Sequence, residues 1–529
     1  MRARPCAFSL SRLWSTMSHH PTHFGAPACS RCVARAAGLL ALHPRPRHAV
    51  AGETRPPRRT RRRMMERLRP CAGVAEAAGV RLSREDLVAL KGKLPLSTAA
   101  ELPAGFRPPV ISPDPAEYEA QCEEKRQRVL ELFGELGVTD VEVFRSAPLH
   151  YRQRAEFTIW HDREANTVVP VMYAAPLPGT KMEGGKGRVY AIPLEVPLAS
   201  PGFTVASEKI NAALQHILAK AGESEVLKTK LFQINLQTTL SGELMASLLY
   251  HRKLDAEWEA AAADLRDSLA DATDLPRPEA AVGEASTTLR RGEAPETGAG
   301  GVSDALPRAP SIIGRSRRQR IVLGDDAVVE EFELQGRGKL RYRQVEECFS
   351  QPNGAVCRSM LEWARDAARA CGGRGALVEL YCGNGNFSVA MSDLFDEVLA
   401  TEISRTSVRA AKWNAATNGA ANVRVARMSD EQFAAAWHAG EACEHLGVQD
   451  WAQHDLRCAL VDPPRAGCDP GTVRLLSEFP RVIYISCNPE TLLRDARALA
   501  ETHEVERMAM FDQFPYTHHS ECGMCLVRR

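Results

Sequence analysis

The chain has 529 residues, which is too many for one ordinary hydrophobic core, so two folded domains with unstructured pieces are expected. Hydrophobic residues make up 44% and charged residues 25%, as in a soluble globular protein, and no apolar run approaches the roughly eighteen residues of a membrane span. The net charge of +1 excludes a chain that is strongly basic or acidic overall.

That near-neutral total conceals an uneven distribution of charge. Residues 1–63 contain 13 Arg, no Lys and one acid, Glu53. They therefore carry about +12, and the remainder of the chain about −11. A serine-bearing, Arg-rich, acid-poor N-terminus is typical of an organelle transit peptide, so we expect import into a plastid or a mitochondrion. A basic arm or a translated leader on a cytoplasmic protein is the alternative.

The 15 cysteines are scattered and do not form the framework of a secreted, disulfide-held protein. Cys29 and Cys32 make a CxxC pair, but no second pair follows at zinc spacing. We therefore expect no metal there.

Composition divides the chain into three parts. Residues 1–110 are expected to be a disordered basic arm with a linker, and residues 111–345 an α+β domain. This domain is predicted to begin with a helix start at 112–115 and to contain a hairpin of 232–239 with 243–251. Its segment 272–309 is rich in Ala, Glu, Gly, Pro, Ser and Thr without periodicity, which predicts a disordered insertion.

The third part, residues 346–529, alternates apolar strands with helical segments. This alternation predicts an α/β domain with a mainly parallel sheet covered by helices on both faces. The predicted strands are 376–380, 397–400, 423–426, 458–461, 482–486, 505–511 and 522–527.

A glycine turn, with Gly383 and Gly385, follows the first of these strands and precedes a helix. It lacks the GxGxxG pattern of dinucleotide-binding proteins. Glu402 ends the next strand, where its carboxylate can accept hydrogen bonds from both ribose hydroxyls of an adenosyl ligand. With Asp462 before two prolines at the fourth strand, these features resemble the Rossmann-like fold of S-adenosylmethionine-dependent methyltransferases.

Cys487 stands where an apolar strand ends, before the turn-forming pair Asn488-Pro489. A buried structural cysteine is the alternative, but this is the ligand-binding edge of such a sheet, where N–H groups can lower a thiol pKa. Thiolate addition to carbon 6 of a pyrimidine makes carbon 5 nucleophilic, and a separate base must later remove the carbon 5 proton. This chemistry by itself does not distinguish uracil from cytosine.

Two motifs indicate which nucleobase is the substrate. Ser486-Cys487-Asn488-Pro489, preceded by the Val-Asp-Pro-Pro-Arg of 461–465, resembles the RNA uridine-5-methyltransferase family. The stretch 511–523, FDQFPYTHHSECG, is similar to bacterial-type tRNA (uracil-5-)-methyltransferases, which make 5-methyluridine at position 54 of the T-loop. The similarity runs from about residue 118 to the C-terminus, apart from insertions.

The resemblance implies a role for each matched residue. Cys487 would be the nucleophile and Glu521 the base that takes the carbon 5 proton. The resemblance implies that the α+β domain of residues 111–345 binds RNA. RNA contacts are implied for Phe232 and, at the target nucleotide, Arg465. A monomer that needs no metal is expected, although Glu521 with His518 and His519 could also suggest a metal site. Contacts with S-adenosyl-L-methionine are implied for Gln351, Tyr381, Asn386, Glu402 and Asp462.

Other targets and roles remain as alternatives. The chain could methylate ribosomal RNA or an amino group, which an acid before Pro-Pro can position, or it could be a tRNA-binding or folding factor. Relatives that act on ribosomal RNA often carry a four-cysteine cluster and a β-barrel module, whereas the ordered N-terminal part here offers only Cys122, which favours tRNA. A factor without catalysis should have lost Cys487 or Glu521.

Binding of RNA by a net-acidic body requires a local basic patch, because phosphate contacts dominate affinity. Each candidate cation can also be an ordinary solvated surface charge. The candidates are Arg152, Arg154, Lys228, Lys230, Arg252, Lys253, Arg315, Arg317, Arg318 and Arg320.

Overall fold

The computed structural model describes residues 81–91, 93–162, 164–177, 179–182, 191–199, 202–275, 306–372 and 374–529. The chain divides into the units Met1–Cys71 and Ala72–Arg529, and all the described residues belong to the second unit. The predicted transit peptide, the Cys29 and Cys32 pair and most of the predicted insertion 272–309 lie outside the described residues and stay predictions. Within the described ranges, no helix has the length and apolarity needed to cross a membrane.

The first of two large sheets is built mainly from residues that precede the insertion. Its strands lie in the order β11-β10-β9-β8-β4-β5-β2, with β7 also paired to β5. The predicted hairpin is confirmed, since β8 and β9 pair in antiparallel fashion. The strands are β2 (Phe106–Arg107), β4 (Arg154–Asp162), β5 (Thr167–Pro176), β7 (Ile192–Glu195), β8 (Leu231–Thr238), β9 (Leu244–Tyr250), β10 (Ser311–Arg315) and β11 (Arg320–Leu323).

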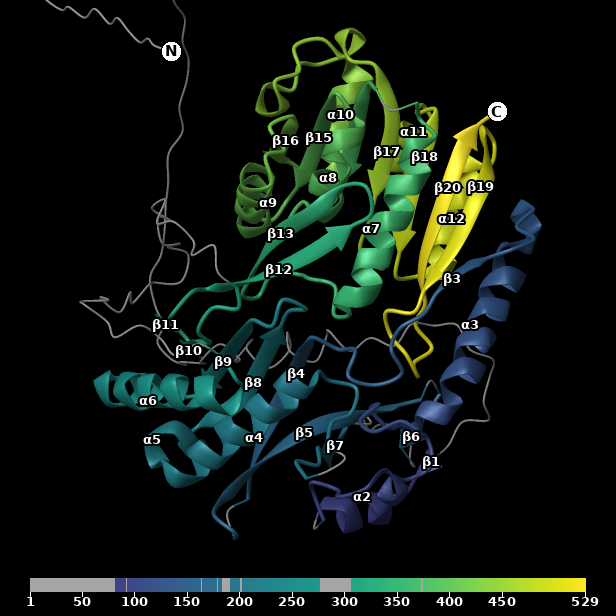
Figure 1. The fold of residues 1–529 in the computed structure, drawn as a ribbon. Helices are drawn as coiled ribbons and strands as arrows, with labels where there is room; N and C mark the ends of the chain where they lie inside the picture. Colours follow the sequence, from purple (N-terminus) through teal and green to yellow (C-terminus); the bar gives the residue numbers. More distant parts are fainter. Residues whose placement is uncertain are drawn as a thin grey trace, which may run out of the picture. The chain divides into compact units, whose positions relative to one another are not determined.

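Helices α4 (Glu208–Glu223), α5 (Glu225–Lys228) and α6 (Ala256–Ala272) pack on this sheet (Figure 1). Each begins at a side chain that caps the first turn: Ser207, Ser224 and Asp255 accept hydrogen bonds from backbone N–H groups. Their apolar faces share one core with the inward residues of the strands.

The second sheet has the order β16-β15-β14-β17-β18-β20-β19-β3. Strands β14 to β18 are parallel to one another, whereas β20 is antiparallel to both of its neighbours, β18 and β19. All seven strands predicted after residue 375 are confirmed. They are β14 (Ala376–Leu380), β15 (Glu397–Glu402), β16 (Val423–Arg427), β17 (Leu456–Val461), β18 (Arg481–Ser486), β19 (His503–Phe511) and β20 (Glu521–Arg528).

Helices cover both faces of this sheet, as expected for an α/β domain. Alternate residues of β18 point to opposite faces: Val482 and Tyr484 enter one core, Ile483 and Ile485 the other. Helix α7 (Gly354–Arg369) precedes the first strand of the parallel group. The helices that follow the parallel strands place their N-termini at the carboxyl edge of the sheet. They are α8 (Asn386–Met391), α9 (Arg405–Thr417), α10 (Asp430–Ala439), α11 (Pro470–Leu476) and α12 (Pro489–Leu499).

Three elements of the predicted domain 111–345 pack with the second sheet instead of the first. Helix α3 (Tyr118–Phe133) lies in the core that contains α12, and β3 (Glu142–Phe144) pairs in parallel with β19. The hairpin of β12 (Ala327–Leu334) and β13 (Gly338–Val345) buries Phe332 and Tyr342 against α7. The core of the second sheet therefore extends across the predicted boundary at residue 345.

Residues 81–91 and 93–110, expected to belong to an unstructured linker, form ordered structure instead. Strand β2 pairs with β5, and helix α2 (Arg84–Lys91) and a bridge from Leu96 to Leu194 lie in the same segment. Leu96 and Phe106 are buried in a small core with Ala174, Ile192 and Leu194. The linker prediction failed because these apolar residues lack a regular period, so only their tertiary packing orders them.

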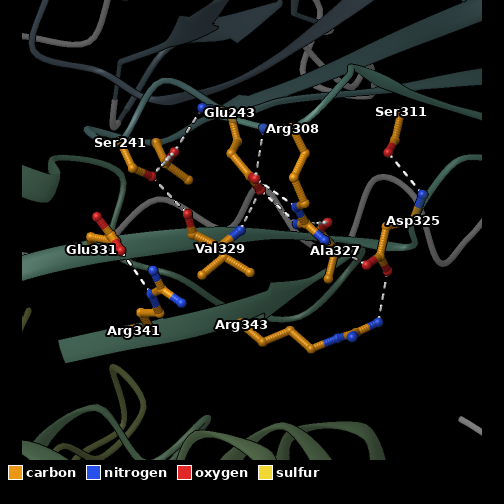
Figure 2. Close-up of polar contacts among 11 residues, drawn as sticks. Ser241, Glu243, Arg308, Ser311, Asp325, Ala327, Val329, Glu331, Arg341 and Arg343 are labelled. Carbon is orange, nitrogen blue, oxygen red and sulfur yellow. Dashed lines mark hydrogen bonds and ion pairs between the residues drawn. The ribbon is translucent and has the colours of Figure 1, made fainter. Parts of the chain in front are cut away.

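An ion-pair network anchors hairpin β12–β13 to the turn between β8 and β9 (Figure 2). Arg308 makes two hydrogen bonds of 2.6 Å to the carboxylate of buried Glu243, and it also contacts Asp325 at 2.8 Å. Val329 N–H donates to Glu243, and Ser241 donates to the Val329 carbonyl, both at 2.7 Å. Arg308, at the end of the predicted insertion, thus ties the chain to the turn between β8 and β9.

Candidate active site at the carboxyl edge of the second sheet

The turn between β14 and α8 forms a concave loop of backbone. Tyr381, Gly383 and Gly385 have φ of 62°, 56° and 77°. A Cβ added at Gly383 would meet no atom within 4 Å, so the space in front of this residue is open. At Gly385 a Cβ would lie 3.2 Å from that of Ala411, so this glycine permits close packing of α9. The loop can therefore accept a ligand against its backbone.

Glu402 fixes the position of this loop from the end of the neighbouring strand. Its carboxylate accepts hydrogen bonds from Gly383 N–H at 3.1 Å and Ser404 N–H at 2.6 Å. Each carboxylate oxygen retains a lone pair for a further donor, such as a ribose hydroxyl. The residues present thus fit an adenosyl ligand, and the contact of Glu402 with it stays a prediction.

The other predicted cofactor residues surround the same edge. Asp462 follows β17, which pairs with β14, and Tyr381 donates a hydrogen bond to Asp430, which begins α10. Asn386 begins α8 and donates to the sulfur of Cys357 on α7 at 3.1 Å. Gln351 lies just before α7, in a loop held by the 2.7 Å bond from Gln153 N–H to the Pro352 carbonyl. Their roles toward a cofactor stay predictions.

Cys487 and Glu521 are brought together by the pairing of β18 and β20. The antiparallel register ends with Ser486 opposite Cys522, so Cys487 and Glu521 are the next residue on each strand. The turn after Cys487 is fixed by Ser486, whose hydroxyl accepts from Asn488 N–H at 3.1 Å. Cys487 is partly buried and Glu521 fully buried. Residues 34 positions apart in sequence therefore share one end of the sheet.

The electrostatics of this site raise the pKa values of its acids. Burial raises the pKa of the Cys487 thiol to about 12, and the Glu521 and Asp462 carboxyls add to this rise. Arg465 opposes it through its charge and a hydrogen bond to the thiol. Burial, with Asp462 as the second cause, raises the pKa of Glu521 well above its usual range. Glu521 can thus be a strong base once ionised.

Glu521 also has an unused hydrogen-bonding atom. Its Oε1 is buried and has no hydrogen-bond partner in the described part of the chain. A buried polar atom without a partner is costly, and such atoms mark places where a ligand or substrate completes the site. The acceptor therefore favours a functional role over a structural one.

The predicted RNA residues lie in different places. Arg465 lies beside Cys487, and its guanidinium is 3.5 Å from the His519 ring. Phe232 lies on β8 at a register shift and stacks on His251, with ring centres 3.8 Å apart. Within the described ranges, no recorded contact joins Phe232 to the Cys487 site.

Several of the basic candidates have structural partners. Arg315 and Arg320 bind Glu346 at 2.7 and 2.9 Å, and Lys228 is buried beside Glu225. These three cations therefore contribute to the fold, whereas Arg317 and Arg318 remain exposed.

The geometry around His518, His519 and Glu521 bears on the alternative of a metal site. In the described ranges, no three His, Cys, Asp or Glu side chains are grouped as metal ligands. Instead, burial and nearby cations lower the pKa of both histidines, that of His519 to about 3. The loop 512–520 that contains them leads directly into Glu521.

Sequence reasoning missed the ion pair that anchors this loop. Lys125 donates to Asp512 at 2.7 Å and to the Phe514 carbonyl at 2.8 Å, and both charged side chains are buried. A signal was available, because Lys125 occupies the buried stripe of α3 with Cys122 and Val129. A lysine in an apolar stripe needs a partner.

Comparisons with a family model and with known proteins point to the same family. The family model described as tRNA (Uracil-5-)-methyltransferase matches residues 117–275 and 306–529. A tRNA/tmRNA (uracil-C(5))-methyltransferase of Aromatoleum aromaticum is 42% identical over 421 residues, covering 80% of this chain and 98% of the relative. A protein of the same name from Azoarcus sp. is 44% identical over 415 residues, covering 78% of this chain and 98% of the relative.

A solved structure shares the fold. It is the Pyrococcus abyssi tRNA (uracil-54, C5)-methyltransferase in complex with S-adenosyl-L-homocysteine, with a TM-score of 0.50 and 18% identity. The match covers 78% of this chain and 83% of that one. At this identity the likeness supports the Rossmann-like fold.

Proposed function

Because the chain belongs to the tRNA (uracil-5-)-methyltransferase family, we propose that it methylates carbon 5 of uridine 54 in the tRNA T-loop. The observation that carries this proposal is the placement of Cys487 and Glu521 on adjacent strand ends, beside a glycine loop and Glu402. A nucleophile, a separate base and a place for an adenosyl ligand are the three parts that the reaction requires.

Cys487 begins the reaction by adding its thiolate to carbon 6 of uracil. The electrons of the carbon 5–carbon 6 double bond move toward the carbonyl at carbon 4, and carbon 5 becomes nucleophilic. Arg465 favours the thiolate, since it opposes the rise in the pKa of Cys487. When bound, S-adenosylmethionine would supply an electrophilic methyl group on a positively charged sulfur. Carbon 5 would take this methyl group, and S-adenosylhomocysteine would leave with the electrons of the broken carbon–sulfur bond.

Glu521 completes the turnover. Its carboxylate removes the proton from carbon 5, the double bond re-forms, and the Cys487 thiolate leaves carbon 6. A carboxylate whose pKa is raised by burial is well suited to this step, because its conjugate acid holds the proton firmly. The unpartnered Oε1 provides an acceptor for the proton.

The target nucleotide must leave its stack to reach this edge, as for other enzymes that modify a base within folded nucleic acid. Phe232, stacked on His251, offers an aromatic surface on the first sheet for an RNA loop. This supports a structured RNA loop as the substrate.

The proposal can be tested with unmodified tRNA transcripts. The full chain, S-adenosylmethionine and a transcript with uridine at position 54 should give one 5-methyluridine, mapped by nuclease digestion and mass spectrometry. A transcript with cytidine at that position should give none. Methylation at another position, or of ribosomal RNA instead, would contradict the U54 assignment.

A second transcript, containing 5-fluorouridine, tests the nucleophile. 5-Fluorouridine carries fluorine at carbon 5 in place of the proton that the base must remove. The covalent adduct therefore persists and migrates as a larger species in a denaturing gel. Cys487→Ala should abolish this adduct while binding S-adenosylhomocysteine as tightly as the unmodified chain. Cys348→Ala, at another partly buried cysteine, is the matched control and should keep the adduct.

A further inference from the structure

The ordered segment 81–111 lies before the region that the family model matches, which begins at residue 117. Its strand β2 pairs with the end of β5, Phe106 opposite Pro176 and Arg107 opposite Ala175. Phe106 is buried, and Arg107, on the alternate face, is exposed. The buried phenylalanine therefore anchors the backbone from which Arg107 projects.

Arg107 reaches the loop that precedes the proposed base. Its Nη1 lies 2.7 Å from Nδ1 of His518. A guanidinium has only donors, so His518 Nδ1 accepts this bond and the imidazole is neutral. The lowered pKa of His518, caused by burial and then by Arg107 and Arg128, agrees with this assignment.

Two more arginines converge on the same three residues, 518–520. Arg128 on α3 donates to the His518 carbonyl at 2.6 Å and to the Ser520 hydroxyl at 3.1 Å. Arg465, after β17, lies 3.5 Å from the His519 ring. Arg107, Arg128 and Arg465 come from three separate segments, and we call them the arginine cluster.

The cluster concentrates positive charge on the rim of the site. Arg107 and Arg128 are exposed, and within the described ranges neither forms an ion pair with a carboxylate. The two histidines between them are neutral, since their pKa values are lowered. Because the body of the chain is net acidic, the positive charge of Arg107 and Arg128 at this place favours an anionic ligand.

The covalent structure of RNA indicates which anion this is. A nucleotide whose base reaches Cys487 and Glu521 is joined to its neighbours through a phosphate on each side. At least one of these phosphates must pass the rim on which the arginine cluster lies. Arginine is the residue best suited to phosphate, which it can bind with two parallel hydrogen bonds.

We propose that the arginine cluster binds an RNA phosphate adjacent to the target uridine, and that segment 81–111 contributes Arg107 to this contact. The inference rests on the proposed function. It assigns to a segment outside the family-matched region a direct part in holding the substrate.

The competing explanation is that Arg107 serves only the loop, by orienting His518 and hence Glu521. The two explanations differ in what they change. A phosphate contact acts on RNA affinity and on its dependence on salt, whereas orientation of the base acts on the rate of the bound complex.

The experiment compares Arg107→Gln, Arg107→Lys and Arg128→Gln in the full chain. Arg81→Gln removes the same charge from the same segment, at strand β1 (Arg81–Leu82), and is the matched control. The measurements are the Kd for an unmodified tRNA transcript at several KCl concentrations, kcat and KM for methyl transfer, and the Kd for S-adenosylhomocysteine.

We expect Arg107→Gln and Arg128→Gln each to raise the Kd and KM for tRNA about fivefold, with kcat and cofactor affinity unchanged. The slope of log Kd against log salt should fall by about one for each arginine removed. Arg107→Lys should restore most of the affinity, and Arg81→Gln should resemble the parent chain.

A loss of kcat without a change in tRNA affinity or salt slope would overturn the proposal in favour of loop orientation. Unchanged kinetics in Arg107→Gln would overturn it as well. These outcomes are distinct from failure of the proposed function, in which the parent chain itself would not methylate the transcript.

Discussion

The Asp462 carboxyl raises the pKa of the Glu521 carboxyl, and both raise that of the Cys487 thiol. Burial is the larger cause for both groups, and the pKa values of all three acids at this strand edge are raised. Without substrate, the nucleophile is thus held as a thiol, which protects it from unwanted alkylation and oxidation.

The first prediction concerns the reactivity of Cys487 as a function of pH. Only the thiolate is alkylated, so a thiol whose pKa is about 12 reacts slowly at pH 8 and faster with each rise in pH. At pH values above the raised pKa of Glu521, Glu521→Gln removes a neighbouring negative charge and should shift the rate profile to lower pH. Arg465→Gln removes a stabilising positive charge and should shift it to higher pH.

Iodoacetamide labelling followed by peptide mass spectrometry measures the rate at each cysteine separately, and so gives the shift at Cys487. Cys348 is an internal control, because the carboxyls that raise its pKa after burial are Asp326 and Glu402. Equal shifts at both cysteines, or shifts of the same sign in the two variants, would show that the assigned charges do not act on Cys487.

The second prediction separates the two halves of the proposed reaction. Glu521→Gln retains the shape of the side chain but cannot take the carbon 5 proton, so methyl transfer should occur once and the methylated RNA should stay bound to Cys487. Labelled methyl groups should migrate with the protein in a denaturing gel, at up to one per chain, and turnover should fall by at least 100-fold. Release of free 5-methyluridine at the parent rate would exclude Glu521 as the base.

Much of this site could be predicted from the sequence because its parts follow uninterrupted apolar strands. Cys487 and Asp462 stand directly after such a run and Glu402 ends one, and the carboxyl ends of parallel strands meet at one edge of the sheet. Local signals were therefore sufficient to bring these residues together.

The elements that were missed depend on contacts between distant parts of the chain. Strand β3 has only three residues and becomes a strand by pairing with β19, more than 360 positions away. Arg107 meets His518 across 411 positions, from a segment with no periodicity. Such partners leave no local pattern, since their conformation is set by the surface on which they pack.

The third prediction concerns the open space in front of Gly383. Gly383 and Gly419 have φ of 56° and 65°, and at either position an added Cβ meets no atom within 4 Å. Alanine should therefore cost similar stability at both positions, about 1 kcal/mol, because the backbone conformation is left-handed. Only Gly383→Ala places a methyl group where the cofactor is expected to lie.

Titration calorimetry with S-adenosylhomocysteine should show binding weakened at least tenfold in Gly383→Ala and unchanged in Gly419→Ala. Thermal unfolding provides the comparison of stability. If the two variants bound the ligand equally well, the glycine loop would not be its binding surface.

The fourth prediction concerns the anchor at the end of the insertion. Glu243 is buried, with 3% of its side chain exposed, and Arg308 is its main partner, with 17% exposed. Arg308→Met would leave the Glu243 carboxylate buried without its counter-ion, which should destabilise the fold by about 3–5 kcal/mol and lower Tm by several degrees. Arg317→Met, at an exposed arginine close by in sequence, should change Tm little.

A second substitution distinguishes loss of charge pairing from loss of packing. Glu243→Gln removes the charge and keeps one of the two oxygens that accept from the backbone N–H groups of Arg308 and Val329. In the Arg308→Met background it should therefore recover part of the lost Tm, because the uncompensated charge is gone. If the double variant were less stable than Arg308→Met, the cost would lie in the packing of the arginine and not in the buried carboxylate.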